Sequence, residues 1–126
     1  MVRRGCRVIR TAPQEGGQHT TMDTMSNTGV YTSGDWQVRA GSEDAFVARW
    51  TEFLEFARAS APGFVSARLF RDATDACHFV SIGEWQSEAT QAAWRGMPGF
   101  AEKLGACRAL CEQDRNSTFK LASRVP

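Results

Sequence analysis

Three stretches decide the fold of this chain: PGFVSARLF at residues 62–70, HFVSIGEWQSEATQAAW at residues 78–94, and MPGF at residues 97–100. Residues 64–71 and 77–85 are runs rich in apolar and β-branched side chains, a pattern typical of strands. The polar segment 72–76 between them has a length that suits a hairpin loop. The two strands should therefore pair antiparallel.

Helix signals follow the second of these strands. Ser87 is a favourable N-cap and Glu88 places negative charge in the first turn, so a short helix is predicted through Trp94. Gly96 and Pro98 should end this helix. A third helix is expected to carry the following residues on one face: Phe100, Leu104, Cys107 and Cys111.

The chain on either side completes the pattern. Residues 29–39 alternate in strand period, and residues 46–57 repeat apolar side chains at helical spacing until Pro62 stops the helix. Near the other end, residues 116–117 form a predicted turn into a last alternating strand over residues 119–125. The resulting order, β-α-β-β-α-α-β, predicts an α+β, ferredoxin-like domain with a four-stranded antiparallel sheet.

The helices of such a domain cover only one face of the sheet. The strands nevertheless carry apolar residues on both faces, since Phe79 and Trp85 alternate with Val80 and Ile82. A sheet of this kind should be buried on both sides. A second copy of the chain is the simplest cover, so we expect a homodimer.

Composition limits the partners. The 126 residues suit one domain, placed at 29–126, and a formal net charge of +1 gives no reason to expect nucleic acid or an anionic membrane as partner. No apolar run approaches the ~18 residues needed to span a bilayer. The four cysteines come without a secretory signal, so we expect a cytoplasmic protein with reduced thiols.

Residues 1–28 differ from the rest of the chain. They are rich in Gly, Gln, Thr and Arg and lack hydrophobic periodicity, so they are predicted to form a disordered tail. A translation start nearer Met22 or Met25, or a basic transit peptide, are the open alternatives.

The quoted stretches, behind an amphipathic helix, resemble the antibiotic biosynthesis monooxygenase family over roughly residues 30–125. The resemblance implies a dimeric α+β barrel that oxidises an aromatic polyketide or quinol with O2, without metal, flavin or other cofactor. The most specific part is SIGEWQSEA at residues 81–89. Family members that oxidise anthrone-type aromatics have Asn, three residues, Trp and then Glu-Ser here. This chain matches at Trp85 and Ser87 and has Ser81 in place of the Asn.

The family site also uses a Tyr on the following helix, where this chain has Gln91, and an Arg later in the chain. The resemblance thus implies Trp85, Ser81 and Gln91 as catalytic candidates. The Asn amide can hold a phenol or enolate oxygen, whereas a serine hydroxyl has only one donor and the shorter serine side chain reaches less far.

Strand geometry groups further residues with these. Phe79, Ser81, Gly83 and Trp85 alternate along one strand, so they should point to one side, and Gly83 should leave a flat slot for an aromatic ring. The alternative is that Trp85 is simply part of the core. The residues expected to contact substrate are Phe79, Gly83, Arg68, Trp50 and Trp94.

The polar side chains that are candidates for anion stabilisation are Arg68, Ser81, Gln91 and Arg95. An ion pair between Arg68 and Glu84 is the structural alternative for Arg68. His78 is expected to be a partly buried structural residue, with a general-base role as the alternative.

Two other kinds of site are not expected. Cys107 and Cys111 lie four residues apart on one predicted helix face, but no CxxC or other paired-ligand spacing is present, so no metal is expected. A branch of the same fold cleaves haem with a His late in the second helical region, and this chain has no His after His78.

Three functions fit these observations. The leading one is a cofactor-independent monooxygenase that acts on a small aromatic substrate with O2. The second is a non-catalytic module that binds a small molecule, and the third is a polyketide cyclase or isomerase. Fold alone does not choose between them.

Overall fold

Four strands form one antiparallel sheet in the order β2-β3-β1-β4. They are β1 (Val30–Val38), β2 (Phe64–Arg71), β3 (His78–Trp85) and β4 (Cys111–Lys120). The structure is a computed structural model that describes residues 29–126, so the tail predicted at residues 1–28 lies outside the described residues. β1 pairs with β3 on one side and with β4 on the other.

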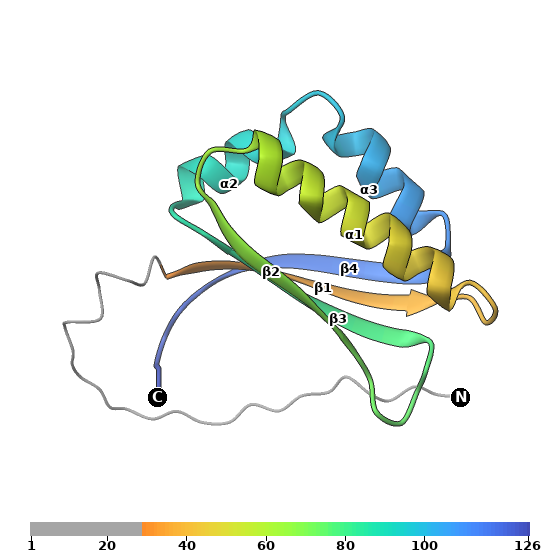
Figure 1. The fold of residues 1–126 in the computed structure, drawn as a ribbon. Helices are drawn as coiled ribbons and strands as arrows, with labels where there is room; N and C mark the ends of the chain where they lie inside the picture. Colours follow the sequence, from red (N-terminus) through yellow and green to blue (C-terminus); the bar gives the residue numbers. More distant parts are fainter. Residues whose placement is uncertain (1–28) are drawn as a thin grey trace.

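Three helices cover one face of this sheet (Figure 1). They are α1 (Glu43–Ser60), α2 (Glu88–Arg95) and α3 (Phe100–Arg108). The element order and the sheet confirm the predicted α+β, ferredoxin-like fold. The largest side chains with almost no exposure lie between helices and sheet: Trp36, Phe46, Phe79 and Trp85.

No helix within residues 29–126 is long and apolar enough to cross a membrane. The cytoplasmic location stays a prediction.

A bulge in β2 changes which of its side chains face the helices. The register of β2 against β3 shifts between Phe64 and Ser66. Phe64 packs edge-on against Trp85 beneath the helices, with ring centroids 5.4 Å apart. Simple alternation predicts that Arg68 and Phe70 share the face of Phe64. Because of the bulge they lie on the opposite face, which we call the outer face.

The C-terminal part differs from the prediction. α3 ends at Arg108, so Cys111 does not lie on a helix but begins β4. Residues 116–117 lie in the middle of β4 rather than in a turn, and residues 121–126 have no regular secondary structure. Pairing with β1 along almost all of β4 outweighs the local turn preference of Asn and Ser.

The start of α2 is fixed by a capping box and by a glycine. Ser87 Oγ accepts a hydrogen bond from the Thr90 backbone N–H at 3.1 Å, and the Ser87 N–H donates to Thr90 Oγ1 at 3.2 Å. Gly63, just before β2, has a φ of +90°, and a Cβ there would lie 2.4 Å from Thr90 Cβ. Gly63 thus lets the α1–β2 turn pack directly on α2.

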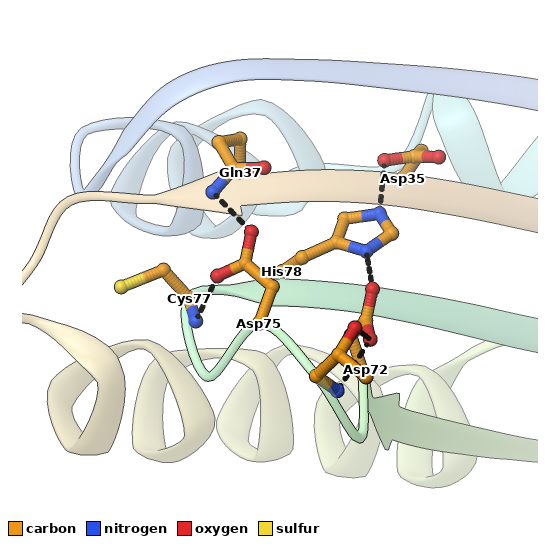
Figure 2. Close-up of polar contacts among 7 residues, drawn as sticks. Asp35, Gln37, Asp72, Asp75, Cys77 and His78 are labelled. Carbon is orange, nitrogen blue, oxygen red and sulfur yellow. Dashed lines mark hydrogen bonds and ion pairs between the residues drawn. The ribbon is translucent and has the colours of Figure 1, made fainter. Parts of the chain in front are cut away.

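His78 ties the β2–β3 hairpin to β1. Figure 2 shows its ring on the outer face between two carboxylates: Nδ1 lies 2.8 Å from Asp72 Oδ2, and Nε2 lies 2.9 Å from Asp35 Oδ1. Burial alone lowers the pKa of His78, but the hydrogen bonds with Asp72 and Asp35 outweigh it and raise the pKa above its ordinary value. Hydrogen bonds from His78 and Thr74 hold the pKa of Asp72 below its usual range.

We expect Gly63→Ala to lower the free energy of unfolding more than Gly41→Ala does. Both positions have a positive φ, so both variants carry backbone strain of roughly 1–3 kcal/mol. Only the Gly63 variant also clashes with Thr90, because a Cβ at Gly41 would meet nothing within 4 Å. Denaturant unfolding of the three proteins measures the difference, and equal losses would contradict it.

The stabilising effect of His78 should depend on pH. It should be complete below the unfolded-state pKa of ~6.5 and be lost as pH rises through the raised pKa of the folded protein. The gap in Tm between the wild type and His78→Gln should therefore narrow as melts are repeated from about pH 5 to about pH 9. Glu55→Gln removes an exposed ion pair without histidine and serves as control. A difference in Tm between the wild type and His78→Gln that stays constant or grows as pH rises would contradict the prediction.

Candidate functional site

A cavity of about 480 Å³ lies between the three helices and the inner face of the sheet, a size usual for small-molecule sites. Residues of all four strands and all three helices line it. Its aromatic lining consists of Trp36, Trp50, Phe53, Trp85, Trp94 and Phe100.

Six of the eight predicted site residues line this cavity: Trp85, Ser81, Gln91, Gly83, Trp50 and Trp94. Phe79 lies deeper in the core, against Phe46, and does not line it. Arg68 is exposed on the outer face, and within residues 29–126 it forms no ion pair with Glu84. The structure therefore separates Arg68 from the other candidates.

Stacked aromatic rings make up much of the wall. Trp85 and Trp94 stack with ring centroids 5.9 Å apart at 29°, and Trp94 stacks in turn on Phe53 at 5.4 Å and 29°. Phe100 meets Trp94 edge-on at 5.0 Å. Because these rings brace one another from β3, α1, α2 and α3, the wall they form is rigid and suits a planar ligand.

Several buried donors in the lining have no partner. Gln91 is only 5% exposed, yet its side-chain amide makes no hydrogen bond within residues 29–126, and the same holds for Trp85 Nε1. Buried polar groups are normally hydrogen-bonded. A ligand with acceptor atoms in the cavity would satisfy these groups.

Ser81 does have a partner. The Trp36 indole N–H donates to Ser81 Oγ at 3.1 Å, and both side chains are buried. Gly34 faces this pair from β1, opposite Ser81 in the register. The serine is thus held in place at the cavity wall.

Arginines supply the charge of the lining. Arg95 and Arg108 are its only charged residues within the described chain, and it contains no Asp, Glu, His, Cys, Tyr or Lys. Arg108 Nε donates to Asp114 at 3.0 Å, and Asn116 Nδ2 donates to the same carboxylate oxygen at 3.1 Å. The cavity therefore offers hydrogen-bond donors and positive charge but no side chain suited to act as a general base.

Sequence reasoning missed many of these lining residues, among them Thr32, Trp36, Arg108 and Asn116. The local sequence predicts a turn at Asn116, whereas this residue lies opposite Gly34, in the same row of the sheet as Ser81. Strand parity could have placed Thr32 and Trp36 on the inner face. No signal in the sequence reveals the pairing that brings Asn116 there.

The remaining candidates lie elsewhere. Both ring nitrogens of His78 are engaged on the outer face, outside the cavity (Figure 2), which supports the structural interpretation. Cys107 and Cys111 lie on different elements and are buried. Burial raises the pKa of the Cys107 thiol to about 12 and that of Cys111 to about 11, so both thiols are protonated and poor metal ligands at neutral pH.

Comparisons with known proteins agree with this fold. Two crystal structures of SnoaB, a cofactor-independent oxygenase from Streptomyces nogalater, are 24% and 25% identical to this chain, with TM-scores of 0.73 and 0.71. The alignments cover 79% and 77% of this chain and 98% and 96% of SnoaB. A conserved protein from Methanosarcina mazei Go1 shares the fold at 11% identity, with a TM-score of 0.69 over 79% of this chain and 98% of its own.

A search of curated proteins found no match. Residues 30–103, more than half of the sequence, match the model of the antibiotic biosynthesis monooxygenase family. The chain therefore belongs to the antibiotic biosynthesis monooxygenase family.

Proposed function

We propose that this protein is a cofactor-independent monooxygenase that binds an electron-rich phenol or quinol of the aromatic polyketide type and lets it react with O2. One observation carries the proposal: an aromatic cavity whose polar lining presents donors and arginines but no carboxylate. Such a lining favours the anionic form of a planar phenol over the neutral form.

We propose a role for each group. Trp85 and Trp94 form a flat wall against which the ring packs, while the Ser81 hydroxyl, the Gln91 amide and Trp85 Nε1 are donors for oxygen atoms. With no base in the lining, the phenol proton leaves to solvent, and the donors stabilise the oxyanion that remains.

The reaction needs no external electrons. The phenolate gives electrons to O2; one oxygen atom becomes a carbonyl on the reacting ring carbon, and the other leaves as water with the single hydrogen of that carbon and the proton that the phenol released. The substrate is the reductant, so the protein's contribution is binding, orientation and charge stabilisation.

A non-catalytic binding module is the second candidate. It is favoured by Ser81 and Gln91, which stand where oxidising members of the family have Asn and Tyr, so the site has fewer groups with a chemical role. A cyclase or isomerase gains no support, because acid–base chemistry needs a titratable side chain that the described lining does not supply.

We also propose that the outer face of the sheet forms a homodimer. Phe70 and Phe119 are 50% and 53% exposed there, and Phe119 lies opposite Tyr31 on the same face. Val80 and Ile82 add apolar surface between them. Exposed apolar area of this kind is unusual unless a partner covers it.

Sedimentation at micromolar concentration should therefore give the mass of a dimer. Phe70→Glu should shift the equilibrium to monomer, because the dimer would bury its charge. Ala101→Glu places the same charge on the exposed surface of α3 and should leave the dimer intact. A wild-type monomer, or equal dissociation of both variants, would contradict the proposal.

Activity tests the site directly. Oxidation of anthrone by the wild type should exceed the rate without enzyme, and Trp85→Ala should abolish this excess. Ser81→Asn should raise the rate by up to the order of 10²-fold associated with one oxyanion donor, since the Asn amide reaches farther and has two N–H donors where the hydroxyl has one.

Thermal melts must accompany the assay, because losing a buried Trp costs ~3–5 kcal/mol. The binding module is the better description if the wild type has no activity and Ser81→Asn with Gln91→Tyr creates it.

A further inference from the structure

We infer that Trp36 is a positioning residue: its indole N–H occupies the oxygen of Ser81 and thereby directs the serine hydroxyl proton toward the ligand in the cavity. The inference rests on the proposed function, because it assigns Ser81 as a donor to a substrate oxyanion. Trp36 is not part of the family motif that implies Trp85, Ser81 and Gln91 as catalytic candidates.

The direction follows from the chemistry of the two groups. Indole has an N–H and no acceptor, so in the 3.1 Å contact Ser81 Oγ must accept. Within residues 29–126, the Ser81 hydroxyl donates to no other group. Its proton therefore remains for a partner in the cavity that Ser81 lines, and rotation back toward the indole is unfavourable.

Gly34 makes room for this contact. A Cβ at Gly34 would lie 2.5 Å from Trp36 Nε1 and 2.7 Å from Ser81 Oγ, so any larger residue would force the two apart. Gly34 is not among the described glycines with a positive φ, so the requirement is for space rather than for backbone freedom.

The indole itself is held from behind. Phe46 of α1 packs on Trp36 with ring centroids 5.3 Å apart, and Phe79 packs on Phe46 at 5.2 Å. Phe79, expected to contact substrate, therefore acts on the site through this stack. The fixed indole gives Ser81 one hydroxyl orientation before a ligand arrives, which lowers the cost of ordering it on binding.

The test compares a phenolate with a neutral molecule of similar shape. We would measure the Kd of 4-nitrophenolate and of 4-nitroanisole for the wild type, Trp36→Phe, Ser81→Ala and the double variant. Ser81→Ala should weaken phenolate binding by about tenfold, the loss of one hydrogen bond to a charged group. Trp36→Phe should weaken it by a smaller factor and leave the Kd of 4-nitroanisole nearly unchanged.

Non-additivity is the decisive result. In the Ser81→Ala background, Trp36→Phe should cause no further loss of phenolate affinity, because the hydroxyl that it orients is gone. Trp50→Phe is the matched control: Trp50 also lines the cavity but has no bond to Ser81, so its effect should multiply with that of Ser81→Ala. Losses from Trp36→Phe and Ser81→Ala that multiply, or equal weakening of both probes by Trp36→Phe, would overturn the inference.

The outcomes separate this inference from the proposed function. A wild type that shows no preference for 4-nitrophenolate over 4-nitroanisole overturns the proposed anion site itself. A wild type with that preference but with multiplicative losses overturns only the role of Trp36.

A measurement on the wild type covers the case in which Trp36→Phe does not fold. The indole N–H signal of Trp36 is identified as the one displaced in Ser81→Ala. Saturation with 4-nitrophenolate should shift it downfield in the wild type, because linked hydrogen bonds polarise one another. A signal that does not move on saturation would overturn the inference.

Discussion

The site depends on the double pairing of β1. Its register with β3 places Gly34 opposite Ser81, and its register with β4 places Gly34 opposite Asn116. Residues from three distant parts of the chain therefore share one row across the sheet. A slip of one residue would turn Trp36 and its neighbours to the outer face and dismantle the cavity floor. The backbone hydrogen bonds of the sheet thus decide which residues lie on its inner face.

The protein supplies the shape and the hydrogen-bond donors of the cavity, whereas a reactive group has to come from the ligand. Stacked rings and unpaired donors provide shape and positive potential, while titratable groups are engaged elsewhere: His78 between two carboxylates, and Cys77 against Glu43. A site of this kind cannot drive proton transfer by itself. It can favour a ligand whose own anion is already reactive, and this fits a family that includes oxygenases without cofactors.

Most of the fold could be predicted from the sequence because its strands and helices carry strong local patterns. The hairpin over residues 64–85 and the N-cap of α2 at Ser87 both follow from local rules. β4 could not be predicted in the same way, since its polar residues acquire strand structure only by pairing with β1. For the same reason the sequence does not predict the inward position of Asn116. The bulge beside Phe64 places Arg68 on the outer face, which strand alternation does not predict.

The cavity takes its lining from all seven elements, spread between Thr32 and Thr118. No single fragment of the domain contains the whole lining, so the unfolded chain would have no affinity for a ligand that requires this cavity. Binding is then linked to folding as a whole, and a ligand present at 100 times its Kd would stabilise the domain by about 2.7 kcal/mol. Thermal shift in the presence of candidate phenols can accordingly identify the ligand class without any assumption about turnover.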